Sequence, residues 1–273
     1  RETISMQFKA LAIDLDGTLL VGEDLPPDNI TALRAARDAG FKIIIATARW
    51  VQMAQRVEEQ IGIKGLVIAC SGAQVHDPET HQDIFDERLP ADFTRDLYTI
   101  CDAERCVATV TVDHEVLLKL DGEPDTSAMP AEMRWVPQLA ETQADLPRVA
   151  NIQGSGVYRR IKDELQPRYG KTVHFFDSIG PSGKVILTLT SSKASKGVAL
   201  RHACNHLKIG LENDVTLGDS ENDIEMIRIS GASVAMGQAD ERTKSAATSV
   251  TVRNDEAGVA RAVEHLLTTG QLP

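Results

Sequence analysis

The sequence is poor in aromatic residues and in positive charge. Aromatic side chains make up 4% of the 273 residues, so a hydrophobic core has to be built largely from Ala, Val, Ile and Leu. The 29 Lys and Arg residues against 40 Asp and Glu residues give a formal net charge of −11. This balance argues against nucleic acid as the main partner, because binding to phosphate backbones requires clustered Lys and Arg side chains. An anionic substrate would instead require a metal ion or a few well-placed cationic side chains.

Cysteine and long apolar runs are also scarce. The four cysteines (Cys70, Cys101, Cys106 and Cys204) lack the paired spacing of a zinc ribbon. Cys101 and Cys106 are near enough in sequence to approach each other, but reduced thiols in a cytosolic protein are the favoured interpretation. No apolar run reaches the roughly 18 residues that span a bilayer, and the N-terminal residues lack the apolar segment of a secretion signal. We therefore expect a cytoplasmic protein without a membrane partner; the sequence specifies no oligomeric state.

Residues 9–20 organise the rest of the sequence. They read Lys-Ala-Leu-Ala-Ile-Asp-Leu-Asp-Gly-Thr-Leu-Leu, an apolar run that leads directly into two carboxylates, Asp14 and Asp16. The run is typical of a strand buried on both faces, and the carboxylates are expected where this strand ends. Two acids two residues apart would share a direction on a regular strand. Together they would form either a cation site or an acid/base pair.

Strands and helices alternate over the first 70 or so residues. A helix is expected to begin with Asp28 as its cap and to end at Gly40. Residues 41–47 form a second buried-strand pattern, 51–61 a helix, and 66–70 a third short apolar run. Such alternation predicts an α/β fold with a parallel sheet and right-handed connections.

From about residue 77 to residue 183 the pattern changes. Prolines become frequent, and the apolar runs are shorter and more alternating. This sequence pattern favours an α+β unit with an antiparallel sheet that is inserted into the first domain. We place the inserted unit at residues 81–185 and the core at residues 1–80 and 186–273. The run at 185–190 is read as the strand with which the core resumes.

Two carboxylate clusters follow predicted strands. Asp14 and Asp16 end the first strand, and Asp219 and Asp223 follow the apolar run at 215–217. If the two strands are parallel neighbours, their carboxyl ends meet at one edge of the sheet, where ligands bind in open α/β folds. An oxygen-only set of carboxylates is what Mg²⁺ prefers. The alternative is that each Asp merely caps a helix or a turn. This alternative explains one cluster more easily than two clusters at matching positions.

Other polar residues lie at corresponding positions. Thr47 and Ser71 end two further strands, where a hydroxyl can either bond an anionic oxygen or cap a helix. Lys196 lies at the start of a predicted helix, a site that disfavours cations unless an anion or a carboxylate cluster lies in front of it. An ordinary exposed lysine is the alternative.

Two further patterns are weaker candidates. His202 and His206 are spaced i,i+4 on one helix, which permits a zinc site but favours a surface or packed pair. The stretch Gly154-Ser155-Gly156 lacks the continuation of a dinucleotide-binding loop and is read as a loop of the inserted unit.

Four short motifs, in this order, resemble those of the haloacid dehalogenase superfamily. They are Asp-Leu-Asp-Gly-Thr at 14–18, Ala-Thr-Ala-Arg at 46–49, Ser-Lys-Gly at 195–197 and Gly-Asp-Ser-Glu-Asn-Asp at 218–223. The long insertion between the second and third motifs is similar to the large α/β cap of the Cof-type sugar-phosphatase branch. The resemblance implies a Rossmann-like parallel sheet flanked by helices, with an inserted α+β cap domain.

The resemblance implies a role for each carboxylate. Asp14 would be the nucleophile that forms an aspartyl-phosphate. Asp16 would be the general acid for the leaving alcohol and then the base that activates water. Mg²⁺ would be held by Asp14, by the backbone carbonyl of Asp16 and by Asp219, with Asp223 close by or bound through water.

The resemblance also implies contacts to the substrate. Thr47, Lys196 and Asn222 would hold the phosphoryl oxygens. Candidate contacts to the rest of the substrate are Arg49, Ser71 and Gly72.

Two positions depart from the branch's usual pattern. Ala48 stands where glycine is common, which affects the local turn more than the chemistry because Thr47 and Arg49 remain. Ser71 stands where asparagine is usual, so a substrate or phosphate contact is expected to differ.

These observations together predict a Mg²⁺-dependent phosphatase that acts on a small phosphorylated metabolite, with a sugar phosphate as the default substrate by family analogy. A phosphomutase or phosphotransferase of the same superfamily is one alternative, and it would return the phosphoryl group to the substrate. A non-catalytic metabolite-binding regulatory protein is the other alternative, and the intact set of Asp14, Asp16, Lys196 and Asp219 argues against it.

Overall fold

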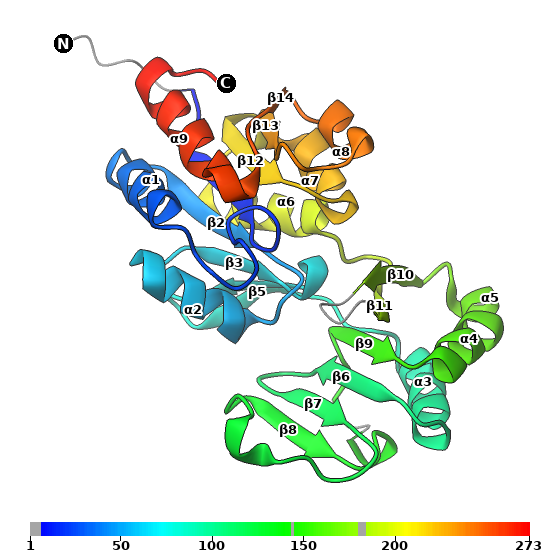
Figure 1. Cartoon of the computed structure of the whole chain (residues 1–273). Coiled ribbons are helices and arrows are strands. Elements are labelled where there is room, and N and C mark those ends of the chain that lie inside the picture. Colours follow the sequence, from blue (N-terminus) through cyan, green and yellow to red (C-terminus); the bar gives the residue numbers. More distant parts are fainter. Residues whose placement is uncertain (1–6, 143–144, 180–183) are drawn as a thin grey trace. The chain divides into compact units, whose positions relative to one another are not determined.

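The computed structural model describes residues 7–142, 145–179 and 184–273, and the chain divides into two compact units (Figure 1). The first unit consists of Arg1–Phe85 and Ser195–Pro273, and the second of Asp86–Ala194. The chain therefore leaves the first unit once and returns to it once.

The first unit is built on a mostly parallel sheet. Within the described residues it has eight strands in the order β14-β13-β12-β1-β2-β3-β4-β5, of which the first six are parallel and β4 runs antiparallel to β3. The strands are β1 Ala10–Asp14, β2 Lys42–Ala46, β3 Leu66–Ala69, β4 Gln74–Asp77, β5 Gln82–Asp86, β12 Asp214–Gly218, β13 Ala232–Ala235 and β14 Ser249–Val250.

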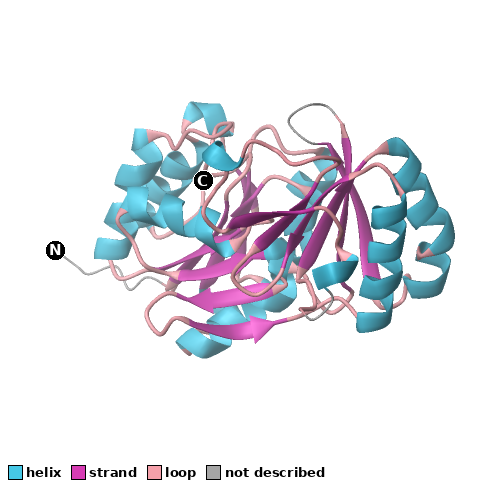
Figure 2. Cartoon of the chain, turned by 90° about the horizontal axis from the view of Figure 1, so that it is seen from below, coloured by secondary structure: helices cyan, strands magenta, loops and turns pink. Residues whose placement is uncertain are grey.

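Helices flank this sheet, as the cyan ribbons in Figure 2 show. The helices of the first unit are α1 Pro27–Asp38, α2 Val51–Ile61, α6 Lys196–Leu207, α7 Ile224–Ile229, α8 Glu241–Ala246 and α9 Gly258–Thr269, with short 3₁₀ turns η1 Cys70–Gly72, η4 Leu211–Asn213, η5 Glu221–Asp223 and η6 Asn254–Glu256.

The central strand β1 is buried on both faces. All five of its residues are buried, and Ala10 and Ala12 pack with aliphatic side chains of β2, β3 and α6 in one core cluster. Its other face carries Leu11 and Ile13, both fully buried. Full burial of such a side chain stabilises the fold by about 1.5–3 kcal/mol. A continuous apolar run is therefore required here, and it carries Asp14 to the edge of the sheet.

The second unit packs three described α-helices on one face of a second sheet. This sheet has the order β10-β11-β9-β6-β7-β8 and is antiparallel except for the β7–β8 pair. Its core combines sheet residues such as Val110 and Leu189 with helix residues such as Phe93. The elements are α3 Ala91–Ala103, α4 Ser155–Glu164, α5 Gln166–Tyr169, β6 Val107–Thr111, β7 Val116–Lys119, β8 Met133–Val136, β9 Val149–Gln153, β10 Val173–Ile179 and β11 Val185–Ser191, with 3₁₀ turns η2 Thr126–Ala128 and η3 Ala140–Thr142.

Three expectations from the sequence were wrong in detail. The strand at 185–190, expected in the core, is β11 and pairs with β10 and β9 in the second sheet. Its side chains alternate, because Leu187 is fully buried whereas Val185 is 50% exposed, as suits a sheet covered on one face. Conversely, residues 82–86 were expected in the inserted unit, but they form β5, which neighbours β4 in the first sheet. Asp28 does not cap α1: Pro26 precedes the helix, and Asp28 lies in its first turn.

All four cysteines are buried and none forms a disulfide among the described residues. Cys106 donates a hydrogen bond to the Cys101 carbonyl, with Sγ 3.4 Å from the oxygen. Across the described part of the chain, helices are too short or too polar to cross a membrane. The cytoplasmic location stays a prediction.

Candidate functional site

The two carboxylate-bearing strand ends meet because β1 and β12 are parallel neighbours. Their register pairs Ile13 with Leu217, so Asp14 and the residues after Gly218 leave the sheet at the same edge. About 200 residues separate the two segments in sequence. This is the carboxyl edge of a parallel sheet, where α/β proteins bind ligands.

Three carboxylates gather at this edge around one lysine. Oxygens of Asp14, Asp219 and Asp223 lie within 4.8 Å of one another. Lys196 Nζ lies 2.6 Å from Asp14 Oδ1 and 2.7 Å from Asp223 Oδ1. Asp14, Asp223 and Lys196 are all buried. Three carboxylates with a single cation leave a net negative charge in a poorly solvated place.

The protonation behaviour of the cluster reflects that excess charge. Burial, followed by the charge of Asp223, raises the pKa of Asp14 well above its usual range, although Lys196 opposes the shift. Burial is also the main reason that the pKa of Asp219 rises to about 6. For Lys196 burial lowers the pKa, but the neighbouring Asp14 and Asp223 charges outweigh it, so its pKa is raised. A hard divalent cation fits this oxygen-only set, because it would supply the missing positive charge.

Lys196 reaches the cluster because α6 begins at this edge. The Ser195 side chain caps the helix by accepting a hydrogen bond from the Val198 N–H at 3.0 Å. Gly72 lets the η1 turn lie against this helix start: a Cβ there would come within 2.1 Å of the Ser195 carbonyl carbon, and its φ is +91°. Ser71 also has a positive φ of 57°. In this arrangement Gly72 serves close packing around Lys196.

Asp223 has a structural role as well as its contact with Lys196. Its Oδ2 accepts hydrogen bonds from the Asp219 N–H at 3.0 Å and the Ser220 N–H at 3.1 Å. The capping alternative considered for this residue therefore holds in part. Asn222, in the same turn, is exposed and accepts a hydrogen bond from Ser220 Oγ at 2.7 Å.

The Asp16 side chain lies outside the carboxylate cluster. Strand β1 ends at Asp14, so the regular alternation that would align the two acids stops there. The Asp16 side chain is 51% exposed and forms a bidentate ion pair with Arg49, whose Nε lies 2.9 Å from Oδ2. Arg49 also contacts Glu23, with Nη1 2.9 Å from Oε2. The expectation that both acids share a direction was wrong.

Thr47 ties the ends of β2 and β3 together. It is fully buried, and its N–H donates to the Ile68 carbonyl at 2.8 Å while its carbonyl accepts from the Ser71 N–H at 3.1 Å. Its Oγ1 accepts from the Arg49 N–H at 3.1 Å. Trp50, rather than Thr47, occupies the N-cap position of α2.

The two histidines of α6 have separate partners. The His202 ring stacks on Phe85 with 4.3 Å between ring centroids, and His206 Nε2 lies 3.4 Å from Asp77 Oδ2. The packed-pair interpretation therefore describes them better than a zinc site does.

Several site residues escaped the sequence analysis. Thr18 Oγ1 donates to Asp219 Oδ1 at 3.2 Å, and its place in the first motif was the available signal. A Cβ at Gly17 would lie 2.3 Å from Asp219 Oδ2, so a larger residue does not fit there. Gln238 and Asn254 hold carbonyls of the turn after β1, and no local pattern marks them.

Comparison with known proteins agrees with this architecture. The haloacid dehalogenase-like hydrolase family model matches residues 11–263. Phosphatase YwpJ of Bacillus subtilis is 34% identical over 95% of this chain and 100% of its own length. The 5-amino-6-(5-phospho-D-ribitylamino)uracil phosphatase YcsE of the same bacterium is 28% identical, over 95% and 96% of the two chains.

A solved structure also resembles the whole chain. A haloacid dehalogenase-like hydrolase from B. subtilis matches with a TM-score of 0.79 at 28% identity, covering 95% of this chain and 100% of the other. The match includes both the core and the inserted unit. The chain therefore belongs to the haloacid dehalogenase-like hydrolases of the Cof type and is an enzyme of the phosphatase class.

Proposed function

We propose that this enzyme is a Mg²⁺-dependent phosphatase that hydrolyses a small phosphorylated metabolite through an aspartyl-phosphate. The observation that carries the proposal is the buried Asp14 carboxylate at the end of the central strand, 2.6 Å from Lys196 Nζ. An anionic nucleophile attacks an anionic phosphate only where positive charge offsets their repulsion. Lys196 is positioned to supply part of that charge.

The proposed reaction has two displacements at phosphorus. In the first, an Asp14 oxygen bonds to phosphorus while the bond to the leaving oxygen breaks, and Asp16 gives its proton to that oxygen. In the second, Asp16 takes a proton from water, whose oxygen attacks phosphorus and releases phosphate with Asp14 restored. Asp16 thereby regains the proton that it gave up in the first displacement, so the cycle closes.

Asp14, Asp219 and Asp223 together with the Asp16 backbone carbonyl would hold Mg²⁺. When bound, the ion neutralises charge on the phosphoryl oxygens and the carboxylates. The oxygen-only donor set and the raised pKa values of Asp14 and Asp219 support this assignment.

The phosphoryl oxygens are assigned to Thr47, Lys196 and Asn222. Lys196 already contacts Asp14, and Thr47 lies at the carboxyl end of the strand beside β1. Further proposed contacts to the substrate are Arg49, Ser71 and Gly72.

The second unit carries a row of uncharged residues whose chemistry suits a hydroxyl-bearing group such as a sugar. The register places one residue from each described strand in this row, on the face opposite the helices. Thr188 Oγ1 donates to Asn151 Oδ1 at 2.8 Å, and these side chains with Thr109 suit hydroxyl groups. None of the six carries a formal charge, so the row itself offers no cation to a carboxylate. The row is Phe176, Thr188, Asn151, Thr109, Leu118 and Trp135.

Phosphate release from a panel of phosphorylated metabolites tests the proposal. We expect hexose and pentose phosphates to be hydrolysed faster than 2-phosphoglycolate, activity to vanish on chelation, and Mg²⁺ to restore it. Undiminished hydrolysis after complete chelation would contradict the metal requirement. Faster hydrolysis of 2-phosphoglycolate would contradict the sugar-phosphate assignment.

Analysis of the products and a binding measurement on the same panel separate the two alternatives. An isomerised sugar phosphate formed without inorganic phosphate would identify a phosphomutase. Tight binding of a phosphorylated metabolite without turnover would identify a regulatory protein.

A further inference from the structure

Backbone hydrogen bonds hold only part of the turn after β1, residues 15–20. The Leu15 carbonyl accepts from the Thr18 N–H at 3.2 Å and from the Leu20 N–H at 2.9 Å, and the Asp14 carbonyl accepts from the Leu19 N–H at 3.2 Å. Gly17 turns the chain with a φ of +82° and passes close to the Asp219 carboxylate. Such a glycine-containing turn is free to adopt other conformations unless further contacts restrain it.

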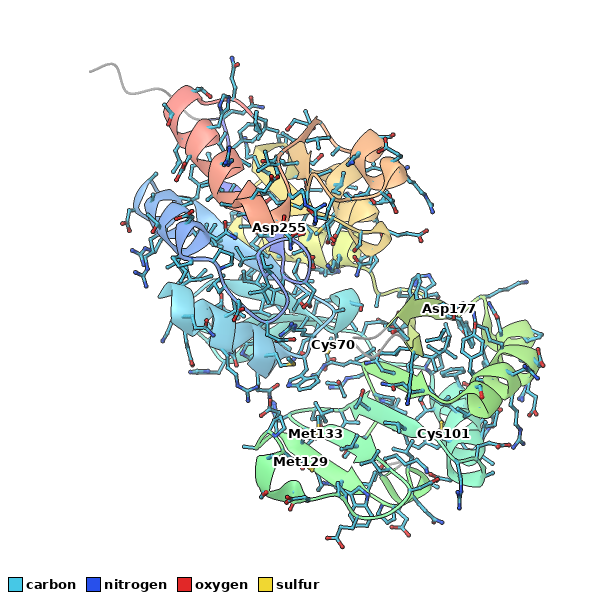
Figure 3. The ribbon with its side chains drawn as sticks, in the orientation of Figure 1. Cys70, Cys101, Met129, Met133, Asp177 and Asp255 are labelled. Atoms are coloured by element: carbon cyan, nitrogen blue, oxygen red, sulfur yellow. The ribbon has the colours of Figure 1, made fainter. Side chains whose placement is uncertain are left out.

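Two amides from the C-terminal part of the chain restrain this turn. Gln238 Nε2 donates to the Gly17 carbonyl, and Asn254 Nδ2 donates to the Leu20 carbonyl at 2.9 Å. The two amides are also joined, because Gln238 Oε1 accepts from the Asn254 N–H at 3.0 Å. Figure 3 labels Asp255, the exposed neighbour of Asn254, on this segment.

A third amide restrains the turn from α1. Asn29 Nδ2 donates to the Leu19 carbonyl at 2.9 Å, and its Oδ1 accepts from the Ala260 N–H at 3.0 Å. Asn29 is fully buried, so both bonds are shielded from water.

Two of the three positions require a side chain that donates and accepts at once. Gln238 and Asn29 each bond a turn carbonyl with the nitrogen and a backbone N–H of the C-terminal segment with the oxygen. A carboxylate of the same shape has no donor and would place its lone pairs against the carbonyl. An apolar side chain of the same size would leave the carbonyl without its partner.

We propose that Gln238, Asn254 and Asn29, the amide clamp, are positioning residues for the reaction. The Leu15 hydrogen bonds fix the Leu15–Asp16 peptide group, and Gln238 fixes the Gly17–Thr18 peptide group. The Asp16 carbonyl and side chain between them therefore keep a constant place relative to Asp14. This inference rests on the proposed function, in which Asp16 supplies a metal ligand and the acid/base group. Small misplacements of such groups cost large factors in rate.

The test compares Asn254→Asp with Asn213→Asp. Asn213 Nδ2 donates to the Gln7 carbonyl at 2.9 Å, near the opposite end of β1, so the two variants lose the same kind of hydrogen bond and gain the same charge. Gln238→Met is the second variant, and it removes the hydrogen bonds of the Gln238 side chain without a charge change. Each variant is measured for kcat and KM with a small aryl phosphate, for Mg²⁺ affinity by calorimetry, and for amide hydrogen exchange at Thr18 and Leu20.

We expect Asn254→Asp and Gln238→Met to lower kcat by about 10- to 100-fold with KM within about twofold. Mg²⁺ affinity should fall several-fold, and exchange at Thr18 and Leu20 should quicken at least about tenfold. Asn213→Asp should change none of these by more than about twofold. Loss of kcat in all three variants alike, or unchanged kcat and exchange in the clamp variants, would overturn the proposal.

Two controls separate this result from other failures. Urea denaturation identifies any variant that loses activity only because it unfolds, and the double variant of Gln238 and Asn254 should cost less than the sum of the single ones because both act in one unit. If the unaltered protein shows no Mg²⁺-dependent hydrolysis, the proposed function fails. Hydrogen exchange and Mg²⁺ affinity then still show whether the clamp holds the turn, and unchanged values of both would overturn it.

Discussion

Lys196 and Asp14 form a buried ion pair, 2.6 Å apart, that joins the start of α6 to the end of β1. The same ammonium group contacts Asp223 at 2.7 Å. One lysine thus contacts two carboxylates, one at the end of β1 and one in the turn that follows the neighbouring strand β12. The pair places a nucleophile candidate, a cation and a metal-ligand set at one edge of the sheet.

Replacing Asp14 with asparagine should abolish nearly all turnover while the fold is retained. The amide keeps the shape of the side chain but cannot form the aspartyl-phosphate. Phosphate release and circular dichroism measure the two effects, with Asp255→Asn as an exposed control. Full Mg²⁺-dependent hydrolysis of an aryl phosphate by the Asp14→Asn variant would disprove the nucleophile assignment.

Lys196→Met should destabilise the protein as well as inactivate it. Removing the cation leaves buried carboxylates uncompensated, and breaking a buried pair in this way costs about 3–5 kcal/mol. Urea unfolding in chelator measures this cost, and exposed Lys193→Met serves as the matched control. Equal stability of the two variants would show that Lys196 does not offset the cluster's charge.

Asp16→Ala should lose activity but keep its affinity for Mg²⁺. The side chain lies outside the carboxylate cluster, and only its backbone carbonyl is assigned to the metal. Calorimetric titration of the variant provides the measurement. Loss of metal binding would mean that the carboxylate itself moves to the ion.

Asp214 should make stability depend on pH. Burial raises its pKa to about 7, and Thr216 and Ser230 oppose this shift only in part by donating hydrogen bonds to Oδ2. Its Oδ1 is buried without a hydrogen-bond partner among the described residues. The folded state therefore holds a proton that the unfolded state releases above about pH 4, so this stabilisation is present below pH 4 and is lost as pH rises through 7.

The Asp214→Asn variant should become more stable relative to the unaltered protein as the pH rises over that range. Its free energy of unfolding, compared with that of the unaltered protein, should rise between pH 4 and pH 8 by up to about 4 kcal/mol. Urea unfolding at several pH values measures the difference, and Asp255→Asn should show no such trend. A flat difference for Asp214→Asn would refute the raised pKa.

Much of the site could be predicted because its signals are local. The apolar run before Asp14, the Gly-Asp pair at Gly218 and Asp219, and the Ser-Lys-Gly motif at 195–197 each occupy a few consecutive residues. A strand that is buried on both faces is mostly apolar, and in β1 the one charged residue, Asp14, lies at the carboxyl end. A few consecutive residues are therefore enough to identify such features.

Other features required the whole fold. The run at 185–191 reads as a core strand, yet its neighbours β9 and β10 place it in the second sheet. Asp16 follows Asp14 by two residues, yet it pairs with Arg49 from another loop.

The sequence by itself determined the polar residues at the ends of two strands and at the start of one helix, and hence the candidates Asp14, Asp219 and Lys196. The tertiary structure decided that β1 and β12 are neighbours, that Asp16 turns toward Arg49, and that distant amides hold the intervening turn. The physical reason is the sequence separation of the interacting residues. Polarity and alternation are set by residues next to one another in sequence, whereas strand order and side-chain partners depend on packing between segments about 200 residues apart.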